Sequence, residues 1–255
     1  MSLAIESIGL RKAFGDLVAV DGINLAVPRG SFYGFLGPNG AGKSTTIKCL
    51  TGLVRPTSGT YRILDLDPAA DPVEVKRRIG VVPEDLALFD RLTGAETLAF
   101  VGQVHGLALA SIRERSTELL ALMDLTRAQN ELVADYSHGM RKKIALATAL
   151  LPAPRLLFLD EPFEGVDAVA SRQIRDLLAH FVKSGGTVFL TSHILEIVDR
   201  LCDHIGIINR GRLVAQGPIA DLRGGTGAGK TLEELFFQLV GADRVAAPSL
   251  DWLSR

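Results

Sequence analysis

The sequence predicts an α/β fold built on a buried parallel sheet, with a β-rich beginning and an inserted helical subdomain. Two short apolar runs, residues 156–159 and 187–190, are continuous rather than alternating, as in strands that are buried on both faces of a parallel sheet. The segment between them, 170–182, has helical spacing, so strand, helix and strand follow one another. Residues 90–152 lack strand-like runs and carry helical spacing instead. They are therefore expected to form the helical insertion.

The other elements follow from apolar periodicity and from turn residues. The first 35 residues are expected to form short strands of an antiparallel β subdomain, broken by Gly15-Asp16, Asp21-Gly22 and Pro28-Arg29-Gly30. Besides 156–159 and 187–190, the expected strands are 3–10, 18–27, 31–36, 59–64, 80–82, 205–209 and 212–215, and the first three of these begin within the first 35 residues. The expected helices are 43–53, 73–79, 95–104, 111–123, 140–151 and about 232–240. One domain would span 1–240, with 241–255 as a C-terminal tail.

Composition and charge narrow the class of protein. The 255 residues include 47% hydrophobic and 22% charged side chains, which is enough for a full core. A formal net charge of -1 gives no general attraction for nucleic acid, so no nucleic-acid partner is expected. Cys49 and Cys202 lie far apart among apolar neighbours and are expected to be reduced, buried thiols. The beginning lacks a secretory signal, and no apolar run approaches the roughly 18 residues of a spanning helix. The chain is therefore expected in the cytoplasm, and another polypeptide would have to cross any membrane at which it acts.

A phosphate-binding loop is expected directly after the apolar segment 32–36. Residues 37–44 fit the pattern GxxxxGK[ST] and stand between a strand and a helix, which is the context that this motif requires. Glycines let the backbone approach the phosphates, Lys43 reaches the terminal phosphates, and Ser44 binds Mg²⁺. The core is therefore predicted to be a P-loop NTPase. The residues expected to contact the nucleotide here are Gly37, Pro38, Asn39, Gly40, Ala41, Gly42, Lys43, Ser44 and Thr45.

A second stretch, 224–231, matches the same pattern, with the sequence GGTGAGKT. No buried strand precedes it, because 218–223 is short and interrupted by polar residues, and the chain after Thr231 is too short for another nucleotide fold. We therefore interpret this stretch as a flexible linker.

Two acids follow the buried strand 156–159, at the sheet edge where α/β proteins bind ligands. Asp160 is expected to hold Mg²⁺ through its water shell, and Glu161 to polarise the attacking water. An Asp-Glu pair after an apolar run is by itself equally consistent with a simple turn, but the phosphate loop upstream favours catalysis. His193 follows the strand 187–190 and is expected to hydrogen-bond the γ-phosphate, although a lone histidine is more often a solvated loop residue.

With these motifs in order, the sequence resembles the ATP-binding cassette (ABC) family over roughly residues 1–240. The deciding motif is Tyr136-Ser137-His138-Gly139-Met140, which corresponds to the family signature LSGGQ. The resemblance implies two cassettes arranged head to tail, with ATP held between the phosphate loop of one and the Ser137 to Gly139 turn of the other. A helix beginning at this turn could direct its amides and dipole at a phosphate. Ser137 can equally be a structural N-cap, and both interpretations can hold.

Further positions carry over by match to the family. Phe14 resembles the aromatic residue that stacks on adenine, with core packing as the alternative. Glu84 occupies the position of a glutamine that contacts Mg²⁺ or its water, and a carboxylate can also do this. Asp167 resembles the aspartate that communicates across the dimer. His138 and Met140 depart from the signature, and altered coupling rather than loss of activity is expected.

The signature variant resembles those of export-type transporters, including multidrug-resistance and polyketide-antibiotic efflux systems. The resemblance implies an ATPase subunit, with ATP and Mg²⁺ as cofactors, on the cytoplasmic face of a membrane. Its implied partners are a separate membrane-spanning permease, docked on 90–152, and a second cassette in a homodimer. One alternative is a soluble ABC-type ATPase, for example of the iron-sulfur assembly type. Another is a small-molecule kinase, which would leave the signature helix without a purpose.

Overall fold

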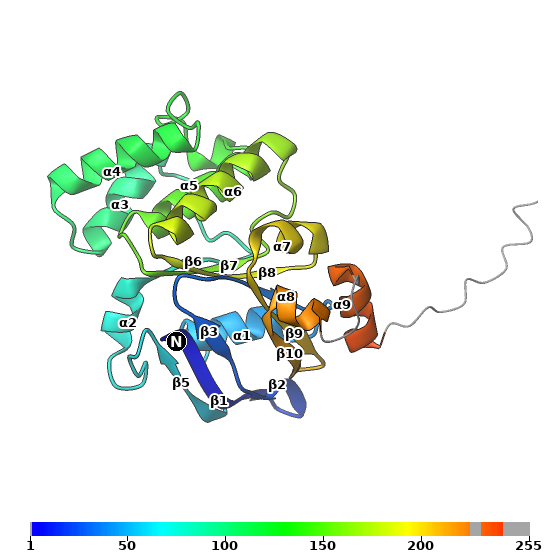
Figure 1. Ribbon diagram of the computed structural model, residues 1–255. Helices are drawn as coiled ribbons and strands as arrows, with labels where there is room; N and C mark the ends of the chain where they lie inside the picture. Colours follow the sequence, from blue (N-terminus) through cyan, green and yellow to red (C-terminus); the bar gives the residue numbers. More distant parts are fainter. Residues whose placement is uncertain (1, 225–230, 242–255) are drawn as a thin grey trace, which may run out of the picture.

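The computed structural model describes residues 2–224 and 231–241, which form two β-sheets with helices packed around them (Figure 1). In this part of the chain a six-stranded sheet has the order β10-β9-β4-β8-β7-β6. Its strands are β4 (Phe32–Leu36), β6 (Ile79–Val82), β7 (Leu156–Asp160), β8 (Thr187–Ser192), β9 (His204–Asn209) and β10 (Arg212–Pro218). Neighbouring strands are parallel except for the antiparallel pair β9 and β10. The predicted α/β fold is confirmed, and the carboxyl ends of the parallel strands meet at one edge of the sheet.

The central strands are buried on both faces, which explains their continuous apolar sequence. In β7, Leu157 and Leu159 pack into a core on the side of the helical subdomain, and Leu156 and Phe158 pack into a core on the opposite side. All four side chains are fully buried. Because successive side chains of a strand point to opposite faces, each face of the sheet needs its own apolar set.

The second sheet is the expected antiparallel subdomain. Its long strand β1 (Leu3–Phe14) pairs with β2 (Leu17–Ile23), β3 (Ala26–Pro28) and β5 (Ser58–Ile63). The prediction of one strand over 18–27 is wrong, because the chain leaves the strand conformation at Asn24 and Leu25, between β2 and β3. At the break, Ser7 of β1 replaces ladder hydrogen bonds: its hydroxyl donates to the Ile23 carbonyl at 3.2 Å and accepts from the Leu25 amide at 2.9 Å.

The helices cover both sides of the large sheet and extend the fold above it (Figure 1). They are α1 (Lys43–Leu50), α2 (Pro72–Arg78), α3 (Gly94–Val104), α4 (Leu109–Leu122), α5 (His138–Leu150), α6 (Ala168–Lys183), α7 (Leu195–Leu201), α8 (Ile219–Gly224) and α9 (Leu232–Val240). The stretch predicted as a helical insertion contains α3, α4 and α5. Sequence periodicity missed α7 and α8. Helices of 7 and 6 residues give only a weak helical repeat, although α2, also of 7 residues, was predicted.

Several sequence-based expectations fall outside the described residues. These are the glycine-rich linker around Lys230 and nearly all of the tail over 241–255. Within residues 2–224 and 231–241, no helix is both long enough and apolar enough to span a bilayer.

Candidate active site

The phosphate loop joins the end of β4 to the start of α1, as its sequence predicts. It is pressed against neighbouring strands of both sheets. A Cβ atom added to Gly42, whose φ is 108°, would lie 2.3 Å from the carbonyl oxygen of Ala19 in β2. A Cβ atom added to Gly37 would lie 2.4 Å from the carbonyl oxygen of Ile208 in β9. Glycine is therefore required at both positions by the close approach of other backbones.

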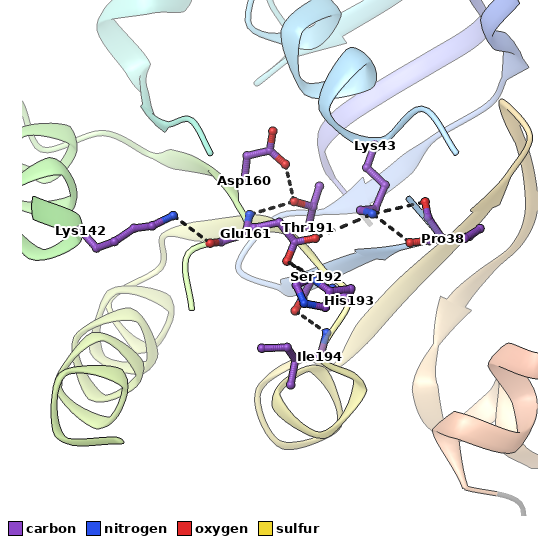
Figure 2. Close-up of polar contacts among 10 residues, drawn as sticks. Pro38, Lys43, Lys142, Asp160, Glu161, Thr191, Ser192, His193 and Ile194 are labelled. Carbon is purple, nitrogen blue, oxygen red and sulfur yellow. Dashed lines mark hydrogen bonds and ion pairs between the residues drawn. The ribbon is translucent and has the colours of Figure 1, made fainter. Parts of the chain in front are cut away.

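Three charged or titratable side chains meet beside this loop (Figure 2). The Lys43 ammonium donates to the Gly37 carbonyl at 2.9 Å and lies 3.8 Å from Glu161 Oε1. The other carboxylate oxygen of Glu161, Oε2, lies 3.0 Å from His193 Nδ1 and accepts from the His193 backbone amide at 3.2 Å. Burial raises the pKa of the Glu161 carboxyl, while the charges of His193 and Lys43 act in the opposite direction. A carboxylate that is buried, oriented and more basic than usual is suited to accept a proton.

The two acids at the end of β7 have different environments (Figure 2). Asp160 is 3% exposed, and its Oδ1 accepts a hydrogen bond of 2.5 Å from the Thr191 hydroxyl. The same hydroxyl accepts from the Glu161 amide at 3.0 Å. Asp160 and Thr191 are paired in the register of β7 and β8, which fixes this contact. Glu161 itself has a φ of 47°, in the left-handed region that non-glycine residues seldom adopt.

A pocket of about 500 Å³ brings most of the predicted site together. Its lining includes these residues that the sequence predicts: Phe14, Asn39, Gly40, Gly42, Lys43, Ser44, Thr45, Glu84, Glu161 and His193. Phe14 is 49% exposed, which does not agree with its alternative interpretation as a core residue. Pro38, Ala41 and Asp160 are each adjacent in sequence to a residue of the lining, and Gly37 precedes Pro38, but these four do not form it. The predicted residues Ser137, Gly139 and Asp167 do not line this pocket either.

Comparison with known proteins assigns the chain to a family. The sequence profile of the family described as ABC transporter matches residues 20–164. The chain belongs to this family. It is 42% identical to the daunorubicin/doxorubicin resistance ATP-binding protein DrrA of Streptomyces peucetius, over 88% of this chain and 68% of that protein. It is 37% identical to the bacitracin transport ATP-binding protein BcrA of Bacillus licheniformis, over 88% of this chain and 72% of that protein.

A solved structure described as the ATP binding subunit of an ABC transporter agrees with this ABC ATPase at a TM-score of 0.87 and 32% identity, covering 93% of this chain and 99% of the other. The ABC fold and the resemblance to drug- and antibiotic-resistance cassettes are thereby confirmed. The chain is an ATPase of the ABC transporter type, and the comparisons favour this function over a soluble ABC-type ATPase.

The signature residues of this ABC ATPase form a second polar region, which we call the signature corner and define as Ser137, His138, Gly139 and Asp167. Ser137 is the N-cap of α5, and its hydroxyl accepts from the Met140 amide at 3.3 Å. Asp167 is the N-cap of α6 and accepts from the amides of Val169 and Ala170, each at 2.9 Å. A Cβ atom added to Gly139 would lie 3.6 Å from Asp167 Oδ2, so the two helix N-termini are adjacent.

The oxygen atoms around the phosphate loop fit a Mg²⁺ ion. Ser44 and Glu84 line the pocket, and one oxygen of Asp160 accepts from Thr191, which leaves the other without that donor. Among the described residues no group of three or more His, Cys, Asp or Glu side chains could hold a metal ion by itself. Mg²⁺ commonly uses one or two protein oxygens together with phosphate oxygens, and the residues here are of that kind.

Sequence reasoning missed several residues of the site. Leu17, Ala19 and Glu164 also line the pocket. Glu164 could have been predicted from the sequence as a third acid after β7. Leu17 and Ala19 of β2 are apolar, and their sequence pattern does not indicate a binding site. Thr191 and Lys142 contact the catalytic segment from β8 and α5, and such contacts depend on strand register and helix packing.

Proposed function

We propose that this chain is the ATP-hydrolysing subunit that powers a membrane exporter, acting as a homodimer with a separate permease on the cytoplasmic face of the membrane. This proposal rests on the observation that the predicted site residues fall into two separate regions. Lys43, Glu161 and His193 meet in one pocket, whereas the turn from Ser137 to Gly139 does not line that pocket. This division supports a mechanism in which the signature turn serves the nucleotide of a second copy.

In the proposed reaction, the loop amides and Lys43 bind the β- and γ-phosphates of ATP. Glu161 accepts a proton from a water molecule, and the oxygen of this water forms a bond to the γ-phosphorus. The bond between this phosphorus and the bridging oxygen then breaks, and ADP and phosphate are released. Ser44, Glu84 and Asp160 would hold Mg²⁺, which when bound would neutralise phosphate charge.

His193 is placed to act on both Glu161 and the γ-phosphate. Its Nδ1 faces Glu161 Oε2 at 3.0 Å, and its side chain is 46% exposed in the pocket. A ring held in this way by the base can direct its other nitrogen towards the developing charge of the phosphate. His193 is therefore a catalytic residue in the proposed reaction.

A surface for the permease is supported by an apolar groove between the helical subdomain and the large sheet. The groove, about 420 Å³, is lined among others by Leu53, Val81, Val101 and His105. Leu53 is 65% exposed, and nearby Val104 on α3 is 68% exposed. We propose that a cytoplasmic segment of the permease covers these side chains.

The test is to capture the tagged full-length chain from gently solubilised membranes of its own cells and to identify stoichiometric partners. Recovery of a multi-spanning membrane protein is expected, and it should be lost when Leu53 and Val104 are both changed to Asp. An exposed position away from the groove, Val214→Asp, is the matched control, because Val214 is 40% exposed on β10. Capture of soluble proteins alone would overturn the exporter while leaving the ATPase intact.

A further inference from the structure

The peptide groups on both sides of the Glu161 side chain are held by side chains from other elements (Figure 2). Its amide donates to the Thr191 hydroxyl of β8 at 3.0 Å, and its carbonyl accepts from the Lys142 ammonium of α5 at 3.0 Å. Glu161 follows the last residue of β7 and has a φ of 47°, so the strand ladder no longer holds it. A left-handed backbone at a residue other than glycine persists only where its surroundings enforce it.

Lys142 is an unusual residue for the interior of a helix. It is only 3% exposed, and its contact is with a backbone carbonyl rather than with a carboxylate. Burial lowers the pKa of this ammonium, and the negative charges of Glu164, Glu84, Glu161 and Asp160 act in the opposite direction. Burying an ammonium is costly, and the packing of a helix does not by itself require a charge at a buried position. A stabilising role alone therefore gives a poor account of Lys142.

We propose that Lys142 is a positioning residue for ATP hydrolysis, acting through its hydrogen bond to the Glu161 carbonyl. This inference rests on the proposed function of Glu161 as the base. The bond fixes the backbone from which the carboxylate reaches towards Lys43 and His193. It also ties that backbone to α5, whose first turn belongs to the signature corner.

Because Lys142 is on the helix that begins at the signature corner, it can also transmit movements of this corner to Glu161. Ser137 and Lys142 lie on the same helix, five positions apart, so a displacement of the helix N-terminus is passed along a rigid element. A phosphate that engages the turn of α5 would therefore bear on the geometry of Glu161 in the same chain. Contact between His138 Nε2 and the Glu164 carbonyl, at 3.3 Å, connects the same regions a second time.

The experiment compares Lys142→Met, which keeps an unbranched side chain one atom shorter and removes the donor, with Lys142→Arg, which keeps donor and charge. In the full-length protein with MgATP, Lys142→Met should lower kcat on the order of 10-fold, because small displacements of catalytic groups are costly. The KM for ATP should change by less than about 2-fold, since the change acts on the chemical step rather than on ground-state binding. The melting temperature should change little, because removal of the buried charge favours folding while the Glu161 carbonyl left without a donor opposes it. Lys142→Arg should recover part of the lost kcat.

The exposed Lys183 at the end of α6 supplies the control Lys183→Met, which should leave kcat unchanged. A parental kcat in Lys142→Met would overturn the proposal, and so would equal losses in the Met and Arg variants. If Lys142→Met does not fold, kcat is measured in Lys142→Gln instead. Its amide is one atom short of the lysine nitrogen and stretches the bond to Glu161, so a parental kcat in this variant would also overturn the proposal.

A double variant separates this inference from the assignment of the base. If Lys142 acts through Glu161, then adding Lys142→Met to Glu161→Gln should lower the residual rate no further. A further 10-fold loss would mean that Lys142 acts independently, which would overturn the positioning role. A parental rate in Glu161→Gln alone would instead overturn the base, whatever Lys142→Met does.

Discussion

In the phosphate pocket, charged side chains are held by partners from distant parts of the chain, whereas in the signature corner polar groups serve their own helices. Glu161 contacts His193, 32 positions away, and lies near Lys43 across the sheet. Ser137 and Asp167 instead accept hydrogen bonds from amides two or three positions onward. The first region is organised within one chain. The second is an exposed pair of helix N-termini, whose positive potential can serve an anion supplied from outside.

The largest effect is expected from the pocket itself, in Lys43→Ala. Removal of the ammonium takes away a cation that the proposed reaction places on the terminal phosphates, so turnover should fall by at least about 10³-fold and ATP binding should weaken. Release of phosphate and binding of a labelled ATP analogue measure the two effects. Full turnover in this variant would show that the pocket is not the site of hydrolysis.

Glu161→Gln should separate binding from chemistry. The amide keeps the size of the side chain but cannot accept the proton, so hydrolysis should drop on the order of 10²- to 10³-fold while ATP still binds. Size-exclusion chromatography with MgATP should then show a stable dimer. Hydrolysis at the parental rate would mean that another group is the base, and a monomer in this variant would contradict a role of the signature corner in a second copy.

Ser137→Ala tests the signature corner with two readouts of different size. Loss of the N-cap should lower the free energy of unfolding by about 1 kcal/mol, whether or not Ser137 contacts nucleotide. Loss of a phosphate ligand should in addition lower kcat by roughly 10-fold or more in the dimer. Thr93→Ala is a matched control, because Thr93 caps α3 in the same way and lies outside the pocket lining. If both variants lose stability and neither loses turnover, Ser137 is only a cap.

The pH dependence of kcat should report the environment of Glu161. Burial raises the pKa of this carboxyl, so the acid limb should lie above the pKa of about 4.3 for an ordinary glutamate. Its ionisation also opposes folding above the raised pKa, and this cost disappears as the pH falls through it. His193→Ala removes a charge and a hydrogen bond that lower this pKa, so the limb should move to higher pH. A limb that stays in place would mean that His193 does not tune the base.

The same contrast explains how much could be predicted from the sequence. The phosphate loop, Asp160-Glu161 and the capped helix at Ser137 are local patterns, each in a strand or helix context that the sequence also shows. The roles of Thr191 and Lys142 depend on strand register and helix packing, and a lysine in a helical pattern normally indicates a solvated face. The break between β2 and β3 was missed because Ser7, a residue of another strand, completes the hydrogen bonds there.

The smallest expected effect comes from the second match to the phosphate-loop pattern. Lys230 lies outside the described residues, but the segments around it are described. The preceding element is the short helix α8 rather than a buried strand. Thr231, which stands where Ser44 would bind a metal, is the N-cap of α9, where its hydroxyl accepts from the Glu234 amide at 3.2 Å. Lys230→Ala should therefore leave kcat and KM unchanged, in contrast to the loss of turnover expected in Lys43→Ala. A comparable loss would mean that the motif acts without a strand before it, and that context is a poor guide to this site.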